Sequence, residues 1–275
     1  MSTVQAIQKF QAGRVLRRLT FCETVSVTTD MTPVETLVRT LAIPPASIGG
    51  VLARMDAVSS AIPGPDGIAE FNRLYRKVTE EVGRSVGAST FEDAAFITRL
   101  DLVFANRYFH ALSQHLTGAR APRSWRALFD ARRRPGVSAL RFAVAGMNAH
   151  INFDLALSLV DTAAERGLAL DVGTPQHRDY ERINQLLGDT MPAAKVWFAT
   201  GAIGLADQAL GQADDDVALW SIERAREAAW VHAETLLALQ GAHRLATRFV
   251  DTLDRTVGLA SRALLAPRSP LVRPS

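Results

Sequence analysis

The stretch Gly146-Met-Asn-Ala-His-Ile-Asn-Phe-Asp-Leu155 places four polar side chains in a segment that is otherwise apolar. At 100° per residue, Asn148 and Asn152 fall on one face of a helix, and His150 and Asp154 fall on another. Large apolar residues occupy the angles between these faces, which is typical of a helix that is buried on all sides. Buried polar groups need partners or a ligand. The pattern therefore predicts a buried central helix and marks where chemistry should be sought.

The apolar residues follow a helical period almost throughout the chain. Thr32-Pro33-Val-Glu35 combines an N-cap, an early proline and an acid, which is typical of a helix start. Helices are predicted at 32–42, 47–60, 68–86, 91–116, 124–131, 138–166, 179–187, 192–209, 214–242 and 244–265. A lone strand candidate, 24–29, has no partner to pair with. We therefore predict an all-α chain: an N-terminal arm at 1–31, a single-domain multi-helix bundle with a buried central helix at 32–265, and a disordered tail at 266–275.

The composition is ordinary for a soluble globular protein: 275 residues, 48% hydrophobic, 21% charged, with a formal net charge of +3. A single cysteine, Cys22, excludes an intramolecular disulfide. No stretch approaches the roughly 20 uncharged apolar residues of a membrane span, and no apolar leader follows the basic N-terminus. We expect a cytoplasmic protein without a membrane span, and we leave a homodimer open.

Seven arginines lie between residues 120 and 141. Such a run is usually a solvated surface, although it could also bind an anionic head group, a carboxylate or a carrier protein. The net charge is small and no recognition motif is present, so nucleic acid is not expected as a partner.

Four segments resemble a known family when taken together. They are 64–75 with Val78 and Thr79, 104–108, 146–155, and 179–184, and the third is the most specific. The chain resembles an actinobacterial family of uncharacterised all-helical proteins, a domain of unknown function, over about residues 47 to 200. The resemblance implies the fold and the location of a site, and it carries no activity.

The central helix offers an acid–base pair. His150 and Asp154 are four residues apart, so the carboxylate can accept a hydrogen bond from the imidazole, fix its tautomer and raise its pKa. Asn148 and Asn152 would add amide donors, and Asp101, on the helix at 91–116, could face His150 or pair with Arg99 or Arg107. The alternative is that the whole cluster is a satisfied structural network. As candidate catalytic residues we take His150, Asp154, Asn148, Asn152 and Asp101.

Further residues are candidates for binding a substrate. Trp125 and Arg126 could line the mouth of a pocket, and Tyr108 and Asn106 accompany Asp101 on its helix. Asp179 suits either a helix cap or a site, and Asn184 is expected to point inward. The candidate substrate-binding residues are Tyr108, Trp125, Arg126, Asn106, Asp179 and Asn184.

No cofactor or metal is predicted. The chain has no His-Glu-x-x-His motif, no Gly-x-Ser-x-Gly elbow and no phosphate-binding loop. If a metal were bound, His150, Asp154 and Asp101 would be its ligands.

These observations favour a polar site in an apolar helical pocket, whose partner is an apolar small molecule. Our first hypothesis is a cofactor-independent cyclase or isomerase acting on a polyketide- or terpenoid-like substrate of bacterial secondary metabolism, by acid–base and shape catalysis. The alternatives are a metal-dependent lipid or ester hydrolase and a non-catalytic ligand-binding or scaffold protein.

Overall fold

The structure is a computed structural model that describes residues 31–88, 90–200 and 222–267, with side chains described outside 188–200. Contacts group the described residues from Thr32 onward into one compact unit. The fold is all-α, as predicted, and the described residues contain no strand. The strand candidate at 24–29, nearly all of the arm and most of the tail lie outside the described residues.

The helices before the central segment are α1 (Pro33–Leu41), α2 (Ile48–Ala61), α3 (Gly67–Gly87), α4 (Ala94–Leu116) and α5 (Arg123–Ala131). After them come α6 (Ala139–Ala149), η1 (His150–Asp154), α7 (Leu155–Arg166), α8 (Pro175–Thr200), α11 (Ile222–Ala238) and α12 (His243–Leu264).

Side-chain caps set several of the helix starts. The predicted capping box is present at α1: the Thr32 side chain accepts a hydrogen bond from the Glu35 amide, and the Glu35 carboxylate accepts one from the Thr32 amide. Each such cap satisfies a backbone donor that the helix itself leaves unpaired. Further caps of this kind are Ser47 at α2, Asp66 at α3, Asp93 at α4 and Ser138 at α6.

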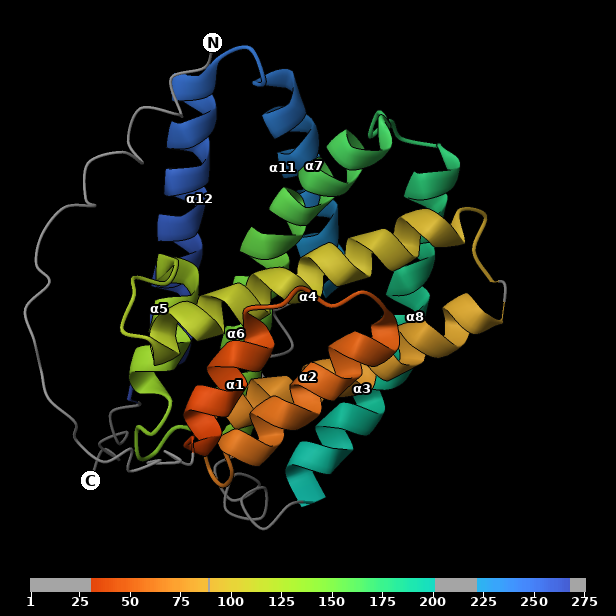
Figure 1. The fold of residues 1–275 in the computed structure, drawn as a ribbon. Helices are drawn as coiled ribbons and strands as arrows, with labels where there is room; N and C mark the ends of the chain where they lie inside the picture. Colours follow the sequence, from red (N-terminus) through yellow and green to blue (C-terminus); the bar gives the residue numbers. More distant parts are fainter. Residues whose placement is uncertain (1–30, 89, 201–221, 268–275) are drawn as a thin grey trace, which may run out of the picture. The chain divides into compact units, whose positions relative to one another are not determined.

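The segment formed by α6, η1 and α7 is the centre of the fold. α6 packs against α3, α5 and α12, whereas α7 packs against α4 and α11. In Figure 1, α4 (yellow) crosses in front of this green segment, and α12 (blue) stands beside it. Being contacted from several sides, the segment is buried almost continuously from 142 to 156, as its apolar character predicts.

Two glycines allow α3 and α6 to approach closely. A β-carbon at Gly146 would lie 2.5 Å from the Phe71 ring, and one at Gly67 would lie 2.6 Å from the Phe142 ring. Only a residue without a side chain fits at either position. The contact brings Phe71 against the central segment, where it joins a cluster of aromatic side chains.

α12 is tied to the rest of the fold by polar contacts at its middle and just after its C-terminal end. The Asp254 carboxylate accepts hydrogen bonds from the backbone amides of Arg123 and Ser124, at the start of α5. Arg134 and Arg141 donate to the carbonyls of Leu265 and Ala266. Arginines of the basic run therefore hold helix ends together in the described residues, in addition to facing solvent.

The prediction for 179–209 was wrong in its details. A helix ending at Leu187 and a second one starting at Pro192 were expected, but α8 continues from Pro175 to Thr200. A proline removes one backbone donor, and α8 tolerates that loss at Pro192. Within the described ranges, no helix combines the length and the apolar character needed to cross a membrane.

Candidate functional site

The central segment contains a π-helical turn at His150–Asp154. The Leu155 amide donates to the His150 carbonyl five residues back, and an α-helix would pair residues four apart. An uninterrupted α-helix over 138–166 was expected, so the prediction missed this turn. Apolar residues surround the segment on all sides, and their period therefore gives no sign of one inserted residue. Turns of this kind are rare and frequently occur at functional sites.

The turn brings His150 and Asp154 into contact, as their spacing predicted. His150 Nδ1 lies 3.0 Å from Asp154 Oδ2, and the same oxygen accepts the indole N–H of Trp125 at 2.8 Å. An oxygen that already accepts the indole proton acts as an acceptor, so Nδ1 carries the proton shared with it. The carboxylate thus fixes the orientation and the tautomer of the imidazole, and Trp125 fixes the carboxylate.

The His150 ring is enclosed by aromatic side chains. It stacks on Phe104, with ring centroids 3.5 Å apart and planes 4° apart, and Tyr75 meets it edge-on at 4.5 Å. Burial lowers the pKa of His150, and the hydrogen bond and charge of Asp154 offset only part of that effect. Asp154 does raise this pKa, as expected from its spacing, but burial outweighs the carboxylate and the net shift is downward. A neutral ring protonated on Nδ1 leaves a lone pair on Nε2, an atom that is buried and has no partner in the described structure.

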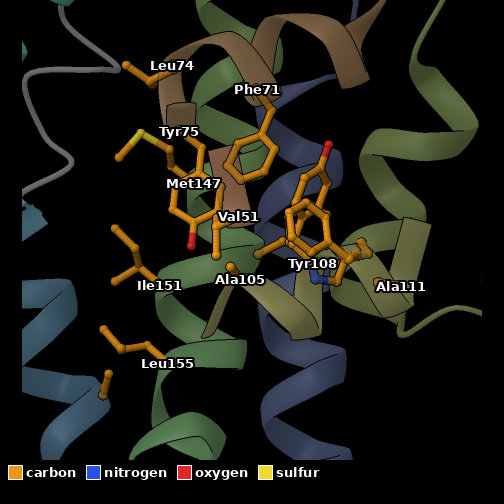
Figure 2. Packing of buried hydrophobic residues seen from close by; sticks show 14 of the residues in the cluster. Val51, Phe71, Leu74, Tyr75, Ala105, Tyr108, Ala111, Met147, Ile151 and Leu155 are labelled. Atoms are coloured by element: carbon orange, nitrogen blue, oxygen red, sulfur yellow. The ribbon is translucent and has the colours of Figure 1, made fainter. Parts of the chain in front are cut away.

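An apolar pocket of about 670 Å³, counting the open space at its mouth, lies beside this ring. Figure 2 shows Met147, Ile151 and Leu155 in a row along the central segment, with the rings of Phe71 and Tyr75 beside them. Four polar side chains interrupt the otherwise apolar wall. The described residues that line the pocket are Phe71, Tyr75, Val78, Val82, Ile97, Leu100, Asp101, Phe104, Met147, His150, Ile151, Leu155, Ile183, Leu187 and Arg226.

Asp101 and Tyr75 also bring unpaired polar atoms to this pocket. Asp101 Oδ2 is buried without a hydrogen-bond partner in the described structure, and burial raises the pKa of Asp101 to about 7. Arg99 pairs with Glu165 and Arg107 pairs with Asp161, so neither arginine neutralises Asp101. The hydroxyls of Tyr75 and Thr79, one turn apart on α3, interact with each other, and no other described group bonds either of them. His150 Nε2 and Asp101 Oδ2 are therefore two unpaired atoms on residues that line one apolar pocket, and Tyr75 adds a hydroxyl to the same wall.

A family model described as a family of unknown function, DUF5995, matches residues 48–267. The match covers most of the chain. The chain belongs to this family. No curated protein and no solved structure matches it. The match extends well beyond the 47–200 expected from the sequence resemblance.

In this DUF5995 member, Asn148 and Asn152 form a structural tie. Asn148 Nδ2 donates to the Val257 carbonyl at 3.1 Å and to Ser261 Oγ at 2.9 Å, both on α12. Asn152 Nδ2 donates to Asn148 Oδ1 at 2.9 Å, as their four-residue spacing allows. Of the four polar residues in the segment, His150 is the one that lines the pocket. The contacts of the two asparagines therefore support the structural interpretation of this pair.

Alanine at Asn148 should lower the free energy of unfolding by about 1–3 kcal/mol, because its partners on α12 would stay buried without a donor. Urea melts of Asn148→Ala and Asn106→Ala would measure this difference. Asn106 is half-buried and makes no side-chain hydrogen bond with the described residues, so its variant should stay within about 0.5 kcal/mol of the wild type. Equal stability of the two variants would contradict the tie.

The remaining predicted residues on α4 and α5 lie away from the pocket wall. Tyr108 is fully buried and its hydroxyl donates to Asn72 Oδ1 at 3.4 Å. Trp125 is fully buried as well, so it holds Asp154 and does not line a pocket mouth. Arg126 and Asn106 are half-buried and neither lines this pocket. The sequence predicted helices at these positions, but the side chains lie in the core or contact residues outside the pocket wall.

Asp179 and Asn184 belong to α8. Asp179 accepts hydrogen bonds from the amides of Glu92 and Asp93, so it caps the chain before α4 and not its own helix. Asn184 Oδ1 accepts a hydrogen bond from Arg226 Nε at 2.6 Å, and Arg226 itself lines the pocket. Arg226 was not predicted as a site residue. The sequence pattern could have indicated that Arg226 is buried, because Ala229, Trp230 and Ala233, which are all buried, follow it at helical spacing.

No group of three or more metal-binding side chains is assembled among the described residues. The three potential ligands, His150, Asp154 and Asp101, do not meet in one such group. Asp154 is instead occupied by its two donors, His150 and Trp125.

Asp101 should make the stability of the protein depend on pH. An aspartate in the unfolded chain titrates near pH 4, whereas the native pKa is about 7. Between these values the native state binds more protons than the unfolded state, so the free energy of unfolding falls as the pH rises. Asp101→Asn removes this loss, and the variant should gain stability over the wild type from pH 4 to pH 8. Urea melts at both pH values measure the change, with the exposed Asp171→Asn as the control. An unchanged difference between Asp101→Asn and the wild type would contradict the raised pKa.

Proposed function

We propose that this protein is a cofactor-independent acid–base enzyme, an isomerase or cyclase that moves protons on an apolar small molecule of polyketide- or terpenoid-like character. The observation that carries the proposal is that His150 and Asp101 both line one apolar pocket, and that each has a buried polar atom without a hydrogen-bond partner in the described structure. General bases and acids act best when their pKa lies near the working pH. A neutral imidazole and a carboxyl group with a pKa of about 7 supply one of each at neutral pH.

The residues have separable roles in such a reaction. His150 Nε2 takes a proton from a carbon next to a carbonyl group, and its positive charge is stabilised by Asp154. Protonated Asp101 gives a proton to the carbonyl oxygen or to a distant carbon, and the Tyr75 hydroxyl can donate a hydrogen bond to the developing negative charge. When the proton from Asp101 goes to a distant carbon, the double bond moves. When the deprotonated α-carbon attacks a second carbonyl carbon of the substrate, the π bond of that carbonyl breaks, its oxygen takes the proton from Asp101 and a ring closes. The two groups return to their first state by exchanging protons with water.

The surroundings of the pair suit this chemistry. The stacked Phe104 ring and the Asp154 hydrogen bond hold the imidazole in one orientation, so little reorganisation is needed when it takes up charge. The apolar wall accommodates a hydrocarbon skeleton and lowers the local dielectric, which strengthens each polar contact with the reacting group.

A non-catalytic ligand-binding protein is the second candidate. The rings of Tyr75 and Phe104 around His150 favour it, because such close ring packing stabilises the core and would account for a buried histidine without catalysis. The hydrolase alternative gains no comparable support, because the described residues assemble no set of metal ligands.

Proton exchange into apolar ketones separates these candidates. β-Tetralone and a cyclohexenone with a β,γ double bond would be incubated with the protein in deuterium oxide, and deuterium uptake would be followed by mass spectrometry. An acid–base enzyme should accelerate uptake at the α-carbon and conjugate the double bond of the enone. Binding of the ketones without faster exchange than in buffer would favour the ligand-binding protein.

A further inference from the structure

Arg226 on α11 is a buried cation that has no anionic partner among the residues with described side chains. Its exposed fraction is 5%, and no described carboxylate forms an ion pair with it. Its Nε donates to Asn184 Oδ1 at 2.6 Å and its Nη2 donates to the Tyr180 carbonyl at 2.7 Å. The guanidinium lies 4.0 Å from the centre of the Tyr180 ring. These neutral contacts orient the group, and no described carboxylate compensates its charge.

An uncompensated buried charge is costly, so it calls for an explanation. The buried carboxylates Asp66 and Asp179, by contrast, are paired with arginines: Arg132 bonds Asp66 at 2.6 Å, and Arg182 bonds Asp179 at 3.1 Å. Burial lowers the pKa of Arg226. An arginine nevertheless stays protonated in proteins, and it cannot avoid the cost by losing its proton.

The guanidinium has donors to spare on the side of the pocket. An arginine carries five N–H donors, and the two hydrogen bonds above use one on Nε and one on Nη2. Nη1 makes no hydrogen bond with the described residues. Because Arg226 lines the pocket, its unused donors are the ones available to a ligand there.

We propose that Arg226 binds the carboxylate of the ligand, so that the substrate of this pocket is an apolar monocarboxylic acid. This assignment rests on the apolar pocket of the proposed function and narrows its substrate class. The planar fork of a guanidinium matches the two oxygens of a carboxylate, and the pair exchanges one buried positive charge for a neutral unit.

The charge of the pocket favours a carboxylate over a phosphate or diphosphate. Arg226 is the one arginine or lysine among the described residues that line the pocket. A phosphate ester carries about two negative charges at neutral pH, and a diphosphate ester carries more. Asp101 in the same wall would add a further negative charge when it is ionised. A single cation balances one carboxylate, whereas a polyphosphate would bring uncompensated charge into the pocket.

Binding to Arg226 would also serve the chemistry. Tyr180 and Asn184 fix the guanidinium from α8, and η1 and α4 carry His150 and Asp101 on other sides of the same pocket. A carboxylate held at this point gives the skeleton one orientation relative to the acid–base pair. Binding energy from a part of the substrate that does not react can in this way position the part that does.

A matched pair of probes tests the assignment. Decanoate and decanol share a chain and differ in the charged end, and their binding to the full-length wild-type protein would be measured by calorimetry at pH 7.5. We expect decanoate to bind about 10- to 100-fold more tightly than decanol, the range of one charge-assisted hydrogen-bonded pair. Equal affinity for the two probes would overturn the assignment without any variant, and so would binding of neither.

Variants at Arg226 locate the preference. Arg226→Met should bind decanoate about 10- to 100-fold more weakly while decanol affinity stays the same, and Arg226→Lys should keep part of the preference. Arg244→Gln, at an exposed position on α12, is the control and should match the wild type. An unchanged preference in folded Arg226→Met would overturn the proposal. If Arg226→Met does not fold, the lysine variant and the wild-type comparison still decide. In the wild-type protein, ketone exchange without a preference for decanoate would refute the carboxylate site alone, whereas a preference for decanoate without ketone exchange would refute the enzyme alone.

Discussion

Alanine in place of His150 should lower the rate of deuterium exchange into a ketone substrate by about 10²- to 10⁴-fold, the usual contribution of a positioned general base. The reason is geometric: Nε2 is the unpaired nitrogen of a ring whose other nitrogen is held by Asp154. His150→Gln should lose a similar factor, because an amide cannot take up the proton. Trp125→Phe keeps the imidazole and removes one donor to Asp154, so its rate should fall by a smaller factor.

The control for this experiment is another histidine outside the pocket. His115 stacks on Phe129 with centroids 4.8 Å apart and does not line the pocket, so His115→Ala should keep the exchange rate. Thermal melts of each variant would confirm that the assays compare folded proteins. Wild-type exchange by a folded His150→Gln protein would contradict the role of His150 as the base. Unfolding of both His150 variants would favour the structural interpretation of the polar cluster.

Gly146→Ala should be strongly destabilising for the addition of a single methyl group. The added β-carbon would lie 2.5 Å from the Phe71 ring, and Phe71 is itself wedged against Tyr75, Tyr108 and Trp125. Overpacking of a core in this way costs about 1–3 kcal/mol, and more where neighbours cannot move. Helix propensity favours alanine by up to about 1 kcal/mol, which offsets only part of that cost. A drop of several degrees in melting temperature is therefore expected.

Gly87→Ala provides the matched comparison. Gly87 is the last residue of α3, and a β-carbon there would meet nothing within 4 Å. The substitution should be neutral or stabilise the protein by up to about 1 kcal/mol. If Gly146→Ala had the same melting temperature as Gly87→Ala, α3 and α6 would have room to separate, and the predicted clash would be wrong.

The parts that could be predicted from the sequence depend on local geometry. The capping box at Thr32 and Glu35 joins residues three apart, and the contacts of His150 with Asp154 and of Asn148 with Asn152 join residues four apart. Spacing within one helix fixes such pairs before any tertiary structure is known. The all-α class follows for the same reason, since the helical period is a local property.

The parts that could not be predicted depend on distant segments meeting. Asp154 receives a donor from Trp125, 29 residues away, and Asn184 receives one from Arg226, 42 residues away. No local pattern encodes these encounters. In the sequence, Arg226 in particular resembles a surface arginine of an amphipathic helix. Its contacts with α8 become apparent only in the folded structure. The direction of the His150 pKa shift was missed for a related reason, since burial is a property of the whole fold.

The π-helical turn also makes the length of this stretch a constraint. The extra residue is taken up by the wider turn, so the helical period of the residues after the turn is shifted by one position, about 100°, from the period of those before it. Deleting one residue from 150–154 should remove the bulge and leave a continuous α-helix in which Leu155, Leu159 and Ala163 stay in the core. Deleting one residue from the middle of α6 or α7 removes no bulge, and it would rotate every side chain that follows by about 100°. A deletion in the turn would therefore disturb the contact between His150 and Asp154 and spare the packing of α7.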